Sequence, residues 1–214
     1  MFIGHFAMAF AAKKTVPRVS LGTLFISVQF LDLLWPVLLL TGIEHVRIDP
    51  GNTVVTPFDF YDYPFSHSLV GTLGWAALFS LAYFAVRGDR IGSGILAAGV
   101  ASHWILDVVT HRPDVPVLAD GPYLGLGLWN SLAGTIVVEL ALLGIGVFLY
   151  LGSTRATDRV GSFGSWGLIA FLVAAWLGNI FGDPPPNVTT VAIVTNSLWL
   201  LVAWAYWVDR HRSH

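Results

Sequence analysis

Three residues near the middle of the sequence have the types and the spacing of metal ligands. They lie in the apolar stretch "ASHWILDVVTH" (residues 101–111) and are His103, Asp107 and His111, each four residues from the next. Residues four apart lie one above the other on the same face of an α-helix. An imidazole and a carboxylate one turn apart can bind one metal ion from a single helix face. The stretch therefore predicts a metal site on this helix.

The third residue of this row does not fit the same ion on a regular helix. His111 is about 12 Å along the axis from His103, which is too far to share one ion. Either Asp107 bridges two ions about 3.5–4 Å apart, or the helix ends early and the chain folds His111 back. The Arg-Pro pair at residues 112–113 favours an early end, because the residue before a proline avoids the α conformation.

Few other ionisable residues fall inside apolar segments, and they are His5, Asp32, His67 and Glu139. A carboxylate at the centre of a bilayer costs about 2.5–3.5 kcal/mol, so such groups usually face a cavity or a partner. The helical rise puts Asp32 and His103 at the same depth, about 18 Å from the start of their helices. We expect these residues and the trio above to cluster in one site.

The available donor atoms narrow the choice of metal. The chain has no cysteine, so imidazoles and carboxylates are the ligands available. This set suits zinc, with manganese or iron as alternatives, and one or two ions. Asp32 is interpreted as a ligand or as a hydrogen-bond acceptor beside a kink at Pro36. Glu139 is interpreted as a general base or as half of a structural pair, and the serines flanking His67 as helix caps.

The elements that must position these residues are membrane helices. Of 214 residues, 55% are hydrophobic and only 11% are charged, whereas a soluble domain has about 25% charged residues. The mean hydropathy is +0.70. The sequence predicts an all-α fold, a polytopic membrane bundle forming one domain over residues 1–214, with the metal site in 1–111 and scaffold helices over 128–208. The predicted spanning segments are 19–43, 66–86, 91–111, 128–151, 163–182 and 188–208.

The first apolar stretch and the basic residues predict how the chain sits in a membrane. "MFIGHFAMAFAA" is too short to span and precedes Lys13 and Lys14, the reverse of a signal peptide. It predicts a short helix that enters the membrane part way or lies at its surface. If the six segments alternate, only Arg47 and Arg112 of the eleven basic residues fall on the outer side. The positive-inside rule then places the C-terminus in the cytoplasm and the site toward the outer face.

The order of short motifs resembles a known family. "GH" near the start, "LD" in the next helix, "SHS" opening a third and then "SHWILDVVTH" resemble the bacterial inner-membrane metal-dependent hydrolases often labelled LexA-binding membrane hydrolases. That family is grouped distantly with zinc-dependent phospholipase C. The resemblance covers roughly residues 1–111. It implies an inner-membrane enzyme with metal ligands at His5, Asp32, His67, His103, Asp107 and His111.

The leading hypothesis is a membrane-embedded metal-dependent hydrolase that acts on a lipid phosphoester, or on another lipid or small-molecule substrate, from the outer face. Asp32 or Glu139 would be the general base, with His67 or His111 stabilising charge or acting as acid. One alternative is an alkaline-ceramidase-like amidase that uses a serine beside His67. Another is a transporter using the same polar cluster, which the half-length first helix would suit. The net charge of −2 gives no indication of a nucleic-acid partner.

Overall fold

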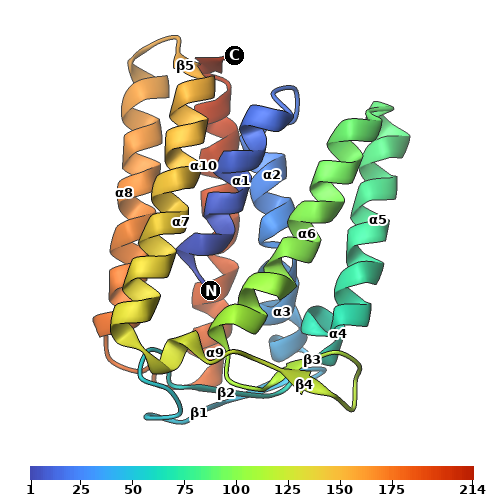
Figure 1. Cartoon of the computed structure of the whole chain (residues 1–214), viewed down its shortest axis with the longest axis vertical. Coiled ribbons are helices and arrows are strands. Elements are labelled where there is room, and N and C mark those ends of the chain that lie inside the picture. Colours follow the sequence, from blue (N-terminus) through green and yellow to red (C-terminus); the bar gives the residue numbers. More distant parts are fainter.

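The computed structural model describes residues 1–214 and is all-α apart from three short two-stranded ribbons, which confirms the predicted fold class. The long helices run side by side, and the loops gather at two ends (Figure 1). One end holds the C-terminus and is termed the C-terminal end; the other holds β1 to β4 and is termed the hairpin end. The helices are α1 (Ile3–Thr15), α2 (Leu21–Val28), α3 (Phe30–Leu40), α4 (Pro64–His67), α5 (Leu69–Arg87), α6 (Arg90–Thr110), the 3₁₀ turn η1 (Leu128–Asn130), α7 (Leu132–Ser153), α8 (Arg159–Phe181), α9 (Val188–Asn196) and α10 (Leu198–Asp209).

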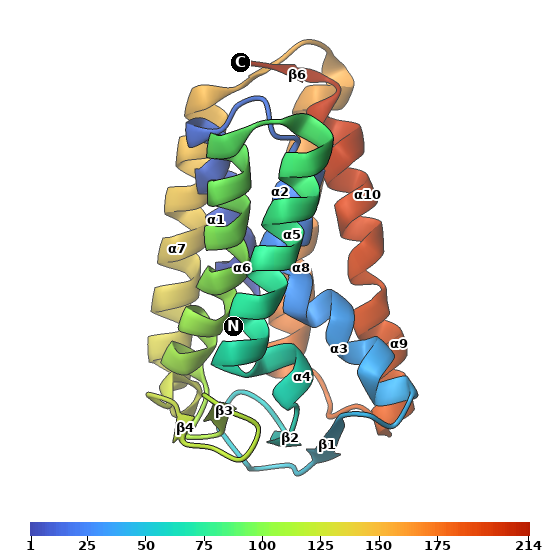
Figure 2. The same cartoon turned by 90° about the vertical axis from the view of Figure 1, so that its right-hand side faces the viewer.

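The short strands close the loops at both ends of the bundle. At the hairpin end, β1 (His45–Ile48) pairs with β2 (Phe58–Asp62), and β3 (Val115–Pro116) pairs with β4 (Tyr123–Leu124), both antiparallel. At the C-terminal end, β5 (Arg155–Ala156) pairs with β6 (Arg212–Ser213). The loops at the hairpin end thus form two hairpins, whereas the C-terminal end joins two strands that are far apart in the sequence (Figure 2).

The helices are those of an integral membrane protein. Five spans are long and apolar enough to cross a membrane, with α9 and α10 forming one of them, and the bent pair α2–α3 makes a sixth. These agree with the six predicted segments to within a few residues. Large apolar side chains such as Val86 and Phe148 remain exposed on the outside of the bundle, as expected where lipid replaces water as the solvent.

The N-terminal helix enters the bundle part way, which is one of the two placements predicted from the sequence. Helix α1 is buried on nearly every side, and the N-terminus lies in the middle of the bundle (Figure 1). It packs directly on α7, where a Cβ added at Gly146 would lie 2.4 Å from the Ala7 carbonyl oxygen. A small residue there lets the two backbones approach closely. The half-length of α1 therefore places His5 near mid-bundle.

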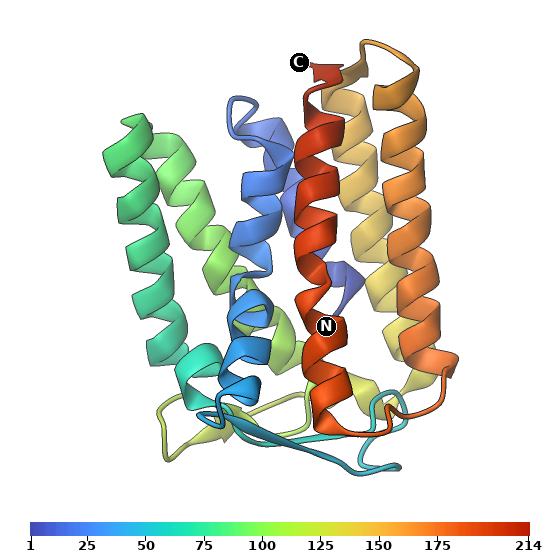
Figure 3. The ribbon, with the colours of Figure 1, turned by 180° about the vertical axis from the view of Figure 1, so that it is seen from behind.

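Helix α3 continues through Pro36, and the sharp break in this span lies earlier, at Gln29. Helices α2 and α3 are bent by 57° at this break (Figure 3). The carbonyl oxygen of Val28 accepts a hydrogen bond from the His103 ring at 2.7 Å instead of continuing the helical ladder. A side chain inserted into the ladder is a recognised cause of a sharp bend. The bend therefore follows from the site.

The basic side chains are divided between the two ends of the bundle as the sequence predicted. The loops between α5 and α6 and between α7 and α8 lie at the C-terminal end, with the end of α1 (Figure 2). Arg47 and Arg112 lie at the hairpin end, where both form ion pairs with Asp59. The main apolar core joins side chains of α1, α2, α6, α7, α8 and α10.

Candidate metal centre

Four helices bring the predicted ligands together near the middle of the bundle. His5 comes from α1, Asp32 from α3, His67 from the last residue of α4, and His103 and Asp107 from α6. All but Asp32 are buried, and the Asp32 side chain is 25% exposed. Five residues that are up to 102 positions apart in sequence thus meet at one place.

The ligand atoms form two overlapping groups of three. His5, His103 and Asp107 make one group and Asp32, His67 and His103 the other, with all ligand atoms in each group within 4.8 Å of one another. His103 Nε2 lies 3.2 Å from Asp107 Oδ2 and 3.8 Å from Asp32 Oδ1. His67 Nε2 lies 3.5 Å from Asp32 Oδ1. Because both groups share His103, the predicted His103–Asp107 pair is the centre of the cluster.

His5 joins this cluster directly. Its Nε2 lies 3.1 Å from Asp107 Oδ1, and its ring stacks flat on the His103 ring with 3.7 Å between the ring centroids. The amine of Met1 also lies 2.8 Å from Asp107 Oδ1. The two oxygens of Asp107 therefore face different sides of the cluster, one toward α1 and the other toward His67 and His103.

Two imidazoles are oriented by an acceptor on their far nitrogen. His103 Nδ1 lies 2.7 Å from the carbonyl oxygen of Val28, so Nδ1 carries the proton and Nε2 presents a lone pair. His67 Nδ1 lies 2.6 Å from Ser66 Oγ, whose hydroxyl donates to Glu44 Oε2 at 2.6 Å. Ser66 must then accept from His67, which again leaves Nε2 unprotonated. Partners on the second nitrogen of this kind typically fix the tautomer and ring orientation of metal-binding histidines.

His111 lies at the edge of the cluster because α6 ends before it. Thr110 is the last helical residue and His111 adopts an extended conformation (φ −67°, ψ 153°). This is the second of the two arrangements predicted for the trio. His111 Nδ1 pairs with Asp114 Oδ1 at 2.9 Å, and Nε2 lies 4.0 Å from Asp107 Oδ1. His111 is in neither group of three, so its assignment as a ligand stays a prediction.

Glu139, predicted as a base or as half of a structural pair, has contacts that account for its burial. Its Oε2 accepts hydrogen bonds from the backbone N–H groups of Phe2 at 3.0 Å and Gly4 at 3.2 Å. These are free donors at the start of α1, where a negative charge is favourable. Glu139 thus holds the start of α1 against α7, and its role as a base stays a prediction.

The donor set fits a divalent cation. His5 Nδ1 and His103 Nε2 are buried without a hydrogen-bond partner, and an unpaired buried polar atom is unfavourable. Two carboxylates face the Nε2 atoms of imidazoles, an arrangement that a bound cation or a proton makes favourable. Imidazole and carboxylate ligands without thiolate suit zinc, manganese or iron. His5, Asp32, His67, His103 and Asp107 could hold such an ion.

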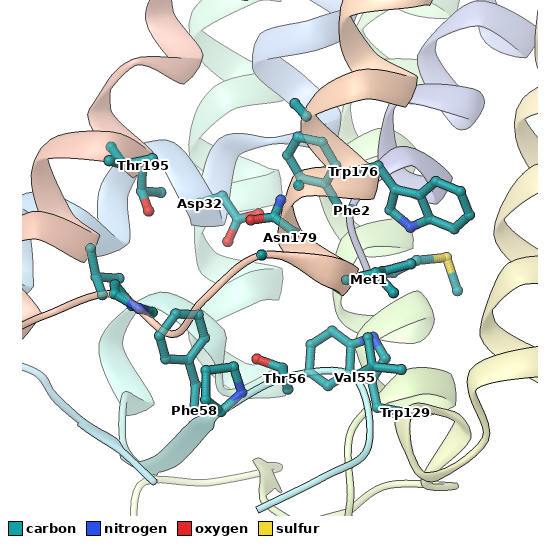
Figure 4. A pocket seen from close by; sticks show the side chains of 18 of the residues that line it. Met1, Phe2, Asp32, Val55, Thr56, Phe58, Trp129, Trp176, Asn179 and Thr195 are labelled. Carbon is teal, nitrogen blue, oxygen red and sulfur yellow. The ribbon is translucent and has the colours of Figure 1, made fainter. Parts of the chain in front are cut away.

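A cavity of about 890 Å³ opens beside the cluster (Figure 4). Asp32, His67, Asp107 and His111 line one side of it, and Trp129 and other aromatic side chains line the hairpin end. Tyr63 also lines it, and burial raises the pKa of its phenol well above the usual range. Its protonated hydroxyl donates to the carbonyl oxygen of Asp114 at 3.2 Å.

Sequence reasoning missed two parts of the site. Glu44 is buried and accepts hydrogen bonds from the backbone N–H and the hydroxyl of Ser66. The prediction that both serines cap a helix holds for Ser68, which accepts from Gly71 N–H, and is wrong for Ser66. The segments taken as scaffold also line the cavity through Trp176, Asn179 and other residues. The only sequence signal for the role of Glu44 was the position of this acidic residue at the end of a predicted span.

The fold and the site define an integral membrane protein with a buried His/Asp cluster able to bind a metal ion beside a large cavity. No family model, no curated protein and no solved structure matches the chain.

Proposed function

We propose that the protein is a membrane-embedded metal-dependent hydrolase that holds one or two divalent ions, with zinc the first expectation. The observation that carries the proposal is the orientation of His67 and His103, whose Nε2 atoms converge on Asp32 and Asp107 while their Nδ1 atoms are bound elsewhere. A structural role needs no such convergence of unprotonated nitrogens. The similarity of the sequence motifs to bacterial inner-membrane hydrolases points the same way.

The cluster residues have distinct roles in this proposal. His5, His67, His103 and Asp107 hold the metal, which when bound lowers the pKa of a water molecule and polarises an ester. Asp32 lines the cavity and is the most exposed member of the cluster, so it is best placed to accept a proton from the attacking water.

His111 is placed to act as the acid for the leaving group. Its ring lines the cavity, and Asp114 is bound to Nδ1 at 2.9 Å. The Asp114 carboxylate on Nδ1 fixes the orientation of the ring. We propose a phosphoester of a membrane lipid as substrate, reached from the outer face, with the C-terminal end in the cytoplasm of a bacterial cell.

The amidase alternative draws less support than the phosphoesterase. Ser66 would be its reacting hydroxyl, but this group is bound to Glu44 and His67, and Ser66 does not line the cavity. Ser68 caps α5. A transporter has a specific observation in its favour, since the break between α2 and α3 and the half-length α1 both end at the cluster, and discontinuous helices often form transport sites.

Elemental analysis of detergent-purified protein tests the metal. We expect at least one equivalent of zinc, manganese or iron in the wild type and background levels in His103→Ala/Asp107→Ala. The matched control is His45→Ala/Asp62→Ala, which removes an exposed His–Asp pair at the hairpin end and should retain the metal. A wild type that binds none of these metals after reconstitution refutes the proposal.

Hydrolysis and transport are then separated by two assays on the metal-loaded protein. We expect release of head group or phosphate from phospholipid vesicles, lost in His103→Ala/Asp107→Ala. Zinc flux into proteoliposomes without hydrolysis of any lipid would instead favour the transporter.

A further inference from the structure

The cavity extends away from the His/Asp cluster to the outside of the bundle. At the C-terminal end, α8 and α10 pack closely, and Trp204 Nε1 donates to the carbonyl oxygen of Gly164 at 3.2 Å. Toward the hairpin end, the cavity is lined by residues of both α8 and the α9–α10 span. It therefore lies between these two helical walls.

Some residues that line this part of the cavity also face the surroundings of the bundle. Phe171 is 49% exposed, Val194 61% and Leu200 72%. Side chains that border a cavity and the outer surface mark an opening between the two. We term this the lateral opening, formed by Phe171 and Gly178 on α8 and by Val194 and Leu200 on the α9–α10 span.

Loops border the hairpin end of the cavity, and some of their lining residues, such as Val54 and Pro184, are themselves exposed. Residues 50–58 between β1 and β2 line it there, and the N–H of Val55 donates to the carbonyl oxygen of Trp129 at 3.1 Å (Figure 4). Pro184 and Pro185 line the same end. The lateral opening thus leads from the cavity to the side of the bundle, between two helical segments long and apolar enough to span a membrane.

The walls of the cavity change character along its length. Near the lateral opening they are mostly apolar, with Ala175, Trp176, Val191, Leu198 and Leu201 among the lining residues. At the other end they present Asp32, His67, Asp107 and His111. A ligand that matches both ends is an amphiphile with an apolar chain and a polar, metal-binding head.

The length of the apolar part matches one leaflet of a membrane. The lining residues of α8 run from Phe171 to Ile180, a rise of about 14 Å. Half of a hydrocarbon core of about 30 Å is about 15 Å. One acyl chain of a lipid therefore has the length to lie along this wall.

We infer that the space between α8 and the α9–α10 span binds one acyl chain of a membrane phospholipid, which enters through the lateral opening. Binding of the chain stands on the cavity alone, while cleavage of its head group rests on the proposed function.

Photo-crosslinking tests the lipid site without relying on hydrolysis. The probe is a phospholipid carrying a diazirine in one acyl chain, mixed into nanodiscs that hold the wild-type protein. We expect labelled peptides to concentrate in residues 171–182 and 191–201.

Two glycine variants provide the matched pair for this experiment. A Cβ at Gly178, which lines the cavity, and one at Gly144, on the exposed face of α7, each meet no atom within 4 Å. Both positions therefore have room for a Cβ atom. Gly178→Phe should lower the labelling about tenfold, the change expected from losing a well-buried apolar contact, while Gly144→Phe should label like the wild type.

Hydrolysis assays separate the two inferences. With metal-loaded protein, Gly178→Phe should lose hydrolysis of a long-chain phospholipid and keep that of a water-soluble nitrophenyl phosphodiester. Focused labelling by a wild type that hydrolyses neither substrate would refute the hydrolase and leave the lipid site standing. Labelling spread over all exposed helices, or unchanged in Gly178→Phe, would overturn the lipid site.

Discussion

The molecule buries charged side chains in two places, and the two clusters differ in how their charges are balanced. At the C-terminal end, Lys13 Nζ lies 2.9 Å from Asp209 Oδ1 and donates to the carbonyl oxygens of Pro17 and Val19 at 3.0 and 2.8 Å. The three hydrogens of the ammonium group thus have three acceptors. This arrangement ties α1 to α10 and needs no further group.

Arg212 completes that cluster in the same manner. Its guanidinium donates to Thr154, Gly161 and Ser165 and lies 5.0 Å above the Tyr150 ring. These contacts fasten the last strand to the start of α8. Lys13 and Arg212 therefore bind groups that the chain itself supplies.

In the His/Asp cluster, the chain does not supply a partner for every polar atom. The lone pairs of His67 and His103 point at carboxylate oxygens, and His103 Nε2 has no hydrogen-bond partner. Burial of charge by itself is weak evidence for a site, because ion pairs also serve as structure. Acceptors facing acceptors are better evidence, because only a bound cation or a proton makes the arrangement favourable.

Of the substitutions that test this difference between the two clusters, Asp107→Asn should have the largest effect. Its oxygens lie 3.1 to 4.0 Å from the Nε2 atoms of four histidines, so loss of the charge should reduce bound metal to background. Elemental analysis measures this, and Asp209→Asn, the same change in the other cluster, should retain the metal. A chelator should lower the melting temperature of the wild type but not of Asp107→Asn, because metal binding to the folded state adds stability.

Lys13→Met should have the next largest effect, on stability alone. It leaves the Asp209 carboxylate without its ammonium partner, and removing one member of a buried pair costs about 3–5 kcal/mol. Reversible unfolding in mixed micelles measures the change in the free energy of unfolding. The neighbouring Lys14 is exposed, so Lys14→Met should behave like the wild type. Loss of metal from folded Lys13→Met would contradict the separation of the two clusters.

A smaller effect is expected from the serines on either side of His67. Ser66→Ala removes the acceptor that orients the ring, and such partners change metal affinity about 10–100-fold. Ser68→Ala removes only the cap of α5, which costs about 1 kcal/mol of stability. Competition with a zinc chelator measures both affinities. Equal affinities in the two variants would show that the Glu44–Ser66–His67 contacts do not act on the metal.

The smallest effect concerns the exposed cap of α8. The N–H of Gly161, followed by the His211 ring, lowers the pKa of Asp158 below its usual value. A lowered pKa in the folded state contributes stability above pH about 4 that is lost as the pH falls through the folded pKa. Asp158→Asn keeps an acceptor but not the charge. Its melting temperature should therefore fall less than that of the wild type between pH 6 and pH 3.

Sequence reasoning succeeded where the relation between residues is local. The His103–Asp107 pair depends only on the repeat of one helix, and the end of α6 before His111 follows from the proline at 113. Charges in apolar segments also identified His5, Asp32 and His67 as site residues, because such groups are too costly to leave facing lipid. It failed at Glu44, whose partner is set by how the first loop folds back on α4.

The sequence by itself determined the membrane class, the limits of the spans, the sorting of basic residues and the pair on α6. Each follows from composition or from neighbours within one or two turns. Tertiary structure alone decided that α1 stops at mid-bundle against Glu139, that the bend lies at Gln29 instead of Pro36, and that α8 and α9 line the cavity. These features depend on how helices distant in sequence cross and pack, and the spacing of residues along one chain does not encode such crossings.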